Sequence, residues 1–118
     1  MILRLSACLK WVGTPRFKAG LLDELYDYLP HMGGLLQEFC DRGAPCESSL
    51  RELSNLVMDA PNQSELSGRF EVRFKESVCL SSPEPAYTEA VTGTVRFVID
   101  LEMGDIALEA EPWPELEH

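Results

Sequence analysis

Basic residues are scarce in the last third of this chain. Arg96 is the single Lys or Arg of residues 76–118, which carry ten Asp and Glu. Residues 1–75 hold the other nine basic residues and ten acids, so nearly all of the formal net charge of −10 lies after residue 75. A surface with this charge repels nucleic acid and phosphate-rich membranes and attracts basic proteins. We therefore expect a basic protein partner, and neither nucleic acid nor membrane.

Long apolar runs are also missing. No run reaches the ~18 residues that a membrane-spanning helix needs. The first residues, MILRL, lack the basic region and apolar stretch of a signal peptide, which favours a cytoplasmic protein. At 118 residues the chain is long enough for one domain with its own core, and we assign that domain to residues 1–115. Residues 116–118, Leu-Glu-His, are typical of the start of an expression tag.

Paired metal ligands are absent. The four cysteines form no C-x-x-C motif, and without an export signal we expect free thiols that fill the core. Structural zinc sites use closely spaced ligand pairs, whereas His31, Cys40 and Cys46 are widely spaced. No D-x-[DN]-x-[DN]-G run for calcium occurs. The sequence therefore predicts no metal site and no cofactor.

Catalytic and nucleotide-binding motifs are absent as well. The chain has no G-x-S-x-G, no G-x-G-x-x-G and no P-loop. His31 is the only histidine before the tag, and a dyad of His31 with Cys40 or Cys46 stays open without any pattern in its favour. We name no catalytic residue, and these absences favour a protein that is not an enzyme.

Four segments precede the C-terminal half. Residues 2–11 alternate between apolar and polar side chains, which predicts a strand. Residues 15–29 carry apolar side chains at helical spacing, and residues 35–40 suggest a short second helix. Residues 49–59 predict a third helix, because a Ser-x-x-Glu capping box precedes leucines spaced three apart.

The C-terminal half predicts strands. Residues 69–75 and 91–103 alternate, and Gly104-Asp105 has the composition of a two-residue hairpin turn leading to a strand at 106–111. The expected element order is β-α-α-α-β-β-β. We therefore predict an α+β two-layer sandwich, with a mostly antiparallel sheet of about four strands and two or three helices on one face.

The predicted final hairpin carries several acidic side chains on one face. With Gly104-Asp105 as the turn, Ile99 faces Ala110 and Asp100 lies opposite Glu109. Like charges directly opposite cost up to ~1 kcal/mol per pair, which a basic partner would offset. The alternative is a solvated face on which basic side chains of neighbouring strands balance these acids, namely Arg69, Arg73, Lys75 and Arg96.

These features favour a small, acidic, non-catalytic protein-binding module, such as an inhibitor, an immunity-type protein or an adaptor, that acts through its sheet face and C-terminal hairpin. Trp113, between two prolines, packs back on the fold or contacts the partner. The partner-binding candidates are Asp100, Glu102, Glu109, Glu111 and Trp113.

Two other interpretations stay open. One is a small-molecule binding protein or enzyme with a site between helices and sheet. Its candidate residues are Tyr26, Tyr28, His31 and Glu76. Glu76 falls on the apolar side of its strand, so its carboxylate is expected to point toward the core. The other is a homo-oligomer that pairs through an exposed sheet edge.

Overall fold

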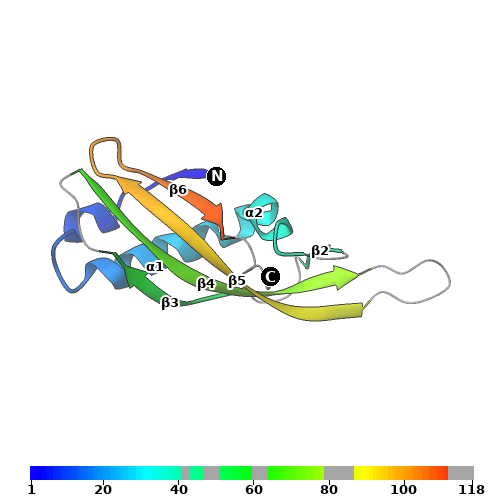
Figure 1. The fold of residues 1–118 in the computed structure, drawn as a ribbon. Coiled ribbons are helices and arrows are strands. Elements are labelled where there is room, and N and C mark those ends of the chain that lie inside the picture. The colour runs from blue at the N-terminus through cyan, green and yellow to red at the C-terminus, as the bar shows by residue number, and fades with distance from the viewer. Residues whose placement is uncertain (41–42, 47–50, 60–63, 79–86, 112–118) are drawn as a thin grey trace, which may run out of the picture.

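A curved antiparallel sheet dominates the protein (Figure 1), here in a computed structural model. The structure describes residues 1–40, 43–46, 51–59, 64–78 and 87–111. The helical elements are η1 (Cys8–Trp11), α1 (Phe17–Tyr28), η2 (Leu29–His31) and α2 (Gly33–Gln37). The strands are β1 (Ile2–Arg4), β2 (Ala44–Pro45), β3 (Glu52–Met58), β4 (Glu65–Val78), β5 (Tyr87–Asp100) and β6 (Asp105–Ala110).

The long hairpin β4–β5 is the backbone of the sheet. Its two strands of 14 residues pair along their full length. The sheet order is β1-β6-β5-β4-β2, and β3 pairs with β4 beside β2. Along β4, Phe70, Val72 and Phe74 are buried and the residues between them are exposed or half-buried, so one face of the sheet forms the core.

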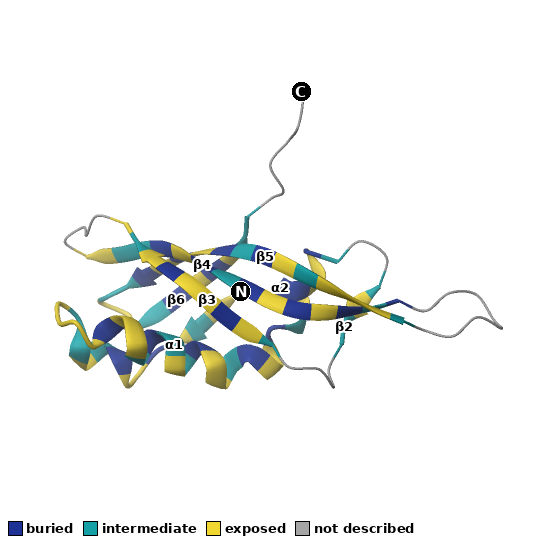
Figure 2. Ribbon diagram, turned by 90° about the horizontal axis from the view of Figure 1, so that it is seen from below, coloured by how far each residue is buried: buried dark blue, intermediate teal, exposed yellow. Residues whose placement is uncertain are grey.

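Helix α1 covers the concave face of the sheet (Figure 2). Its buried side chains Phe17, Leu21 and Leu25 join one hydrophobic cluster with the inward residues of β4, β5 and β6. Each such side chain contributes about 1.5–3 kcal/mol when fully buried. No helix within the described ranges has the length and apolar character needed to cross a membrane.

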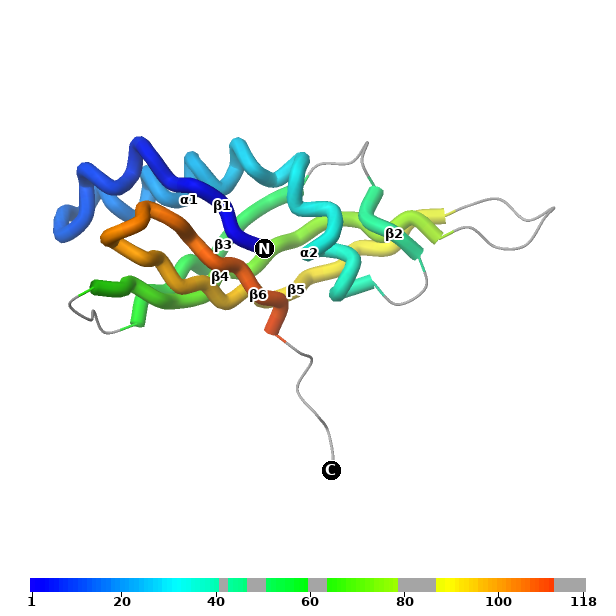
Figure 3. The backbone as a smooth tube through the Cα atoms, turned by 90° about the horizontal axis from the view of Figure 1, so that it is seen from above, coloured from blue at the N-terminus to red at the C-terminus, as the bar shows by residue number. Residues whose placement is uncertain are grey.

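Two tyrosines of α1 reach opposite edges of this sheet. The Tyr26 hydroxyl accepts a hydrogen bond from the Leu53 N–H at 3.0 Å and donates one to the Leu53 carbonyl at 3.2 Å, on the outer edge of β3. The Tyr28 hydroxyl donates to the Arg4 carbonyl at 2.6 Å, in β1. Figure 3 shows β1 and β3 running beside α1. The helix is therefore fixed to the sheet at both margins.

The predicted fold class, an α+β two-layer sandwich with two or three helices and the order β-α-α-α-β-β-β, is wrong. The predicted helix at 49–59 is strand β3, and α2 has only five residues. The sheet has six strands instead of about four, and α1 is the one helix of more than two turns among the described residues. The helix at 15–29 and the strands at 69–75 and 91–103 are confirmed with shifted ends.

A β-bulge explains why β3 resembles a helix in sequence. Its register against β4 shifts between Ser54 and Val57, and Asn55 adopts a left-handed φ of 52°. The extra residue brings Leu53 and Leu56, both 7% exposed, to the same face of the sheet. Apolar residues three apart are the usual sign of a helix, so the bulge produced the wrong prediction. Ser49, the predicted cap, lies outside the described residues.

The N-terminal segment forms less strand than predicted. Only Ile2–Arg4 of the expected strand 2–11 pairs with β6, and a 3-10 helix follows at Cys8–Trp11. The Glu24 carboxylate of α1 accepts hydrogen bonds from the backbone N–H groups of Ser6 and Cys8. These bonds fix the chain in a turn, so the alternating pattern beyond Arg4 does not become a strand.

The turn of the final hairpin is longer than predicted. Residues 101–104 form it instead of Gly104-Asp105, and Ile99 faces Ile106 rather than Ala110. Asp100 holds this turn, because its Oδ1 accepts from the N–H groups of Glu102 at 2.9 Å and Met103 at 3.2 Å. The register moves by an even number of residues, so the inward and outward faces stay as predicted while the cross-strand partners change.

Candidate binding surface on the convex face of the sheet

Two arginines face each other on the side of the sheet turned away from α1. Arg69 of β4 lies directly opposite Arg96 of β5, and both are exposed. Arg96 is in turn opposite Glu109 of β6. Directly opposed like charges destabilise a sheet by up to ~1 kcal/mol. Glu109 offsets part of this cost, and the pair leaves two guanidinium groups facing solvent.

An apolar row lies next to these arginines. Ile2 pairs with Ala107, and Ala107 pairs with Val98, so the three side chains cross β1, β6 and β5 in line. Ile2 is 72% and Val98 41% exposed. Val98 and Ala107 line an open depression of about 590 Å³, together with Arg96 and Glu109. Contiguous exposed apolar side chains with a charged rim are typical of interaction sites.

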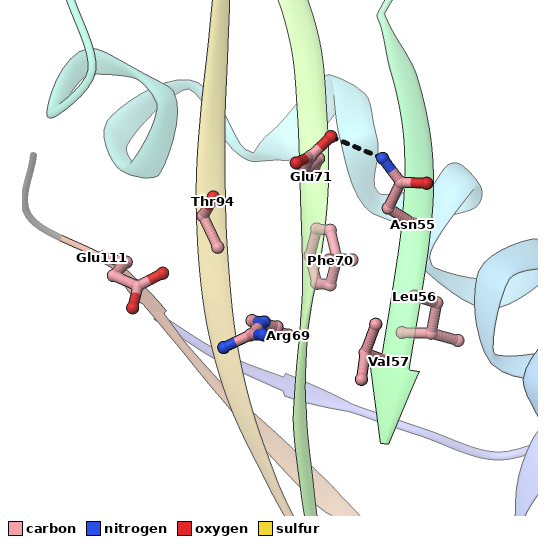
Figure 4. A pocket seen from close by; sticks show the side chains of 8 residues that line it. All are labelled: Asn55, Leu56, Val57, Arg69, Phe70, Glu71, Thr94 and Glu111. Atoms are coloured by element: carbon pink, nitrogen blue, oxygen red, sulfur yellow. Dashed lines mark hydrogen bonds between the residues drawn. The ribbon is translucent and has the colours of Figure 1, made fainter. Parts of the chain in front are cut away.

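A second depression, of about 540 Å³, lies beside the bulge of β3 (Figure 4). The Asn55 side-chain amide donates to Glu71 Oε1 at 2.7 Å, which holds one wall. Arg69 extends from β4 toward β5, on the side where Glu111 lines the opposite wall (Figure 4). The depression therefore presents one cationic and two anionic side chains to solvent.

We define the convex surface as the exposed side chains of these rows. They come from four strands, β1, β4, β5 and β6, and combine apolar, basic and acidic groups. Its members are Ile2, Arg69, Arg96, Val98, Ala107 and Glu109.

The predicted acidic residues divide into two groups. Asp100 lies opposite Asp105 instead of Glu109, and Glu102 is exposed in the turn. Glu109 of β6 lies opposite Arg96, and Glu111, just after β6, lines the same depression as Arg69. The predicted opposition of Asp100 and Glu109 is therefore wrong, and basic side chains neighbour the two glutamates, as in the solvated-face interpretation. Trp113 and residues 116–118 lie outside the described residues.

The candidates for a helix–sheet pocket are not brought together. The Tyr26 and Tyr28 hydroxyls bond to backbone at opposite sheet edges, and His31 is exposed in η2. Glu76 is buried at 2% exposure, as its strand position predicted, and its carboxylate accepts a hydrogen bond from the Gly43 N–H. Burial, and then the charge of Glu76, raises the pKa of the Cys40 thiol.

The described cysteines belong to different segments, because Cys8 lies in η1, Cys40 follows α2 and Cys46 follows β2. Cys8 is fully buried, and burial, a hydrogen bond with Glu24 and the charge of that carboxylate raise its pKa to about 12. Cys40 and Cys46 are half-buried, and Cys79 lies outside the described residues. No three His, Cys, Asp or Glu residues in the described part of the chain are grouped to hold a metal ion.

One residue of the convex surface departs from the alternating pattern of its strand, and that departure is a sequence signal for the surface. Val98 is apolar at a position where its strand expects a polar residue, and it proves to be exposed. The opposition of Arg69 and Arg96 depends on the pairing of β4 with β5, which side-chain periodicity alone does not provide. No family model, curated protein or solved structure matches this chain.

Proposed function

We propose that this protein is a small, non-catalytic protein-binding module of the cytoplasm that acts through the convex surface. The observation that carries the proposal is the exposed row Ile2, Ala107 and Val98 beside the opposed Arg69 and Arg96. The opposite face of the sheet is occupied by α1 and the hydrophobic core. Binding is therefore assigned to the face that solvent reaches.

The energetics of this surface favour a partner. Burying apolar area contributes about 25 cal/mol per Å², so covering the row stabilises a complex. Arginine is enriched among the residues that dominate interface energies, because its planar guanidinium binds carboxylates with two hydrogen bonds. A partner that places an acidic side chain between Arg69 and Arg96 relieves their repulsion as it binds. The complementary surface is thus an apolar ridge with a carboxylate at its side.

The overall charge acts at longer range. A formal net charge of −10 attracts a partner of net positive charge and accelerates the encounter. Asp100, Glu102, Glu109 and Glu111 contribute to that field from the final hairpin. We expect the association rate to fall as salt is added, since the Debye length shortens from about 10 Å at 0.1 M to about 3 Å at 1 M.

The test compares surface variants with matched controls. Val98→Glu places a charge in the apolar row, and Ala19→Glu adds the same charge at an exposed position of α1. Arg96→Glu reverses one arginine, and Lys18→Glu makes the same charge change on α1. Each immobilised protein is exposed to extract of its native cell. A captured partner is then purified, and its affinity for each variant and for the wild type is measured by titration.

Each of the two convex-surface variants should bind the purified partner with an affinity at least about tenfold lower than the wild type, which is about 1.4 kcal/mol. The two α1 variants should bind like the wild type, and melting temperatures should show that all four fold. Equal binding by all five proteins, or no partner for the wild type, would exclude the convex surface as the binding site.

A further inference from the structure

Two free margins of the sheet, at β3 and at β1, are protected. At β3, both outward backbone groups of Leu53 are bonded to the Tyr26 hydroxyl, and the bulge at Asn55 follows. At β1, which has three residues, the Tyr28 hydroxyl occupies the outward carbonyl of Arg4. Bulges, short strands and covering groups prevent an edge from pairing with another chain.

A further free margin is the first half of β5. Strand β6 pairs with β5 only from Val95 to Asp100 (Figure 1). The Glu111 N–H donates to the Thr94 carbonyl at 2.8 Å, which shows that Thr94 directs its backbone groups away from β4. Outward direction alternates along a strand, so Thr92, Ala90 and Thr88 do the same. Within the described residues, no strand pairs with this margin.

The side chains of this margin resemble those of an interior strand. Thr88, Ala90 and Thr92 are exposed, small and uncharged. Glu89 is the one charged residue between Tyr87 and Thr92, and the segment contains neither proline nor lysine. Edge strands of monomeric proteins commonly carry charged residues, lysine above all, or proline, because these residues prevent pairing with another chain. In the part of the chain that the structure describes, this edge therefore presents backbone donors and acceptors without the usual protection.

We infer that a second copy of this chain pairs antiparallel with the first half of β5 across a twofold axis at Ala90. In this register Ala90 faces Ala90 of the second copy, and Thr88 faces Thr92. Each of these residues directs its N–H and C=O outward, so the pairs exchange hydrogen bonds. Threonines opposite each other and small side chains at the axis are favourable cross-strand neighbours.

Side-chain charge and existing bonds select this register. Centring the axis on Glu89 would place two like charges directly opposite at the closest spacing of the ladder. Centring it on Val91 would require Thr94, whose carbonyl already accepts from Glu111. Centring it on Ala90 avoids both conflicts and places Glu89 opposite Val91. The match of the segment to itself is the reason for assigning a second copy, rather than a strand of another protein.

The geometry of the pair follows from the axis. Antiparallel edge pairing extends one sheet into the other, so the convex surfaces of both copies lie on the same side. Each copy carries a formal net charge of −10, so their long-range repulsion opposes the pairing. Dimerisation should therefore strengthen when salt screens that repulsion. A heterologous partner on the convex surface should show the opposite salt dependence.

The experiment is sedimentation velocity of the full chain from about 10 µM to 1 mM, since a single short edge is at the low end of interface sizes. The weight-average mass should rise toward that of a dimer, and the rise should begin at lower protein concentration at about 500 mM salt than at about 50 mM. Ala90→Lys and Ala90→Pro should stay monomeric. The proline removes only the outward N–H, so the ladder to β4 stays intact. Ala19→Lys, with the same added charge on α1, should behave like the wild type.

Amide hydrogen exchange identifies the edge. Exchange at Thr88, Ala90 and Thr92 should slow at least about threefold between the lowest and highest protein concentrations, as the bonded fraction grows. A monomer at every concentration would overturn the inference, and so would a dimer that Ala90→Lys leaves intact. A strand from the same chain could also protect these amides. Slow exchange in a protein that is monomeric at every concentration would therefore overturn the inference as well. None of these outcomes depends on the convex-surface partner.

Discussion

Replacing Glu24 by Gln should lower the free energy of unfolding by about 1–2 kcal/mol at neutral pH. The carboxylate accepts from the Ser6 N–H at 3.0 Å and from the Cys8 N–H at 2.5 Å, and these bonds hold the turn after β1. Hydrogen bonds to a charged acceptor contribute about 1.5–3 kcal/mol each. The amide keeps one acceptor oxygen and the site is partly open to solvent, so only part of that sum is lost.

The dependence on pH identifies the cause. Burial alone would raise the pKa of Glu24, but the N–H groups of Cys8 and Ser6 outweigh it and lower the pKa below 4.5. A group with a lowered folded pKa stabilises above its unfolded pKa, and its contribution is lost as pH falls through the folded value. The difference between wild type and Glu24→Gln should be constant above about pH 5.5 and shrink below about pH 4.

The assay is thermal unfolding of both proteins from about pH 3 to pH 7, with a difference of roughly 4–10 °C expected at neutral pH. Asp23→Asn removes a neighbouring exposed carboxylate from the same helix and serves as the control for charge. A difference that stays the same in acid, or an equal loss for Asp23→Asn, would show that the bonds to the turn are not the source of the stability.

Two further substitutions test the edge contacts and the close packing of the sheet. Tyr26→Phe removes both bonds to the edge of β3 and should cost about 1–2 kcal/mol in urea unfolding, whereas an unchanged midpoint would count against the edge contact. Gly93→Ala places a Cβ 2.5 Å from the Phe39 ring and should cost about 1–3 kcal/mol, whereas Gly34→Ala meets nothing within 4 Å and should be neutral or stabilising.

The sequence predicted the faces of the strands better than their identities and partners. Phe70, Val72 and Phe74 are inward and Arg69 is outward, as a period of two requires. Asn55 was not recognised as a bulge, because its left-handed φ is a backbone property with no periodic signature. That one residue converted a strand into an apparent helix and, with it, changed the predicted fold class.

The candidate site was accessible from the sequence only in part. Glu76 was correctly expected to be buried, because a single charge on the apolar side of a strand is visible in the pattern. Glu24 has the same sequence signature as Asp23, yet only Glu24 reaches the turn at Cys8. Contacts of this kind depend on how α1 is placed against β1, and local periodicity carries no information about that placement.

Strand β1 and strand β6 come from opposite ends of the described chain, and this has a consequence for biosynthesis. Ile2 pairs with Ala107, and the Met1 carbonyl accepts from the Leu108 N–H at 2.7 Å. A ribosome adds about 5–20 residues per second, so β1 emerges roughly 5–20 s before its neighbour exists. During that interval β1 has no strand to pair with, however early the β4–β5 hairpin closes. Strand β1 is thus among the last of the described elements to reach its native position.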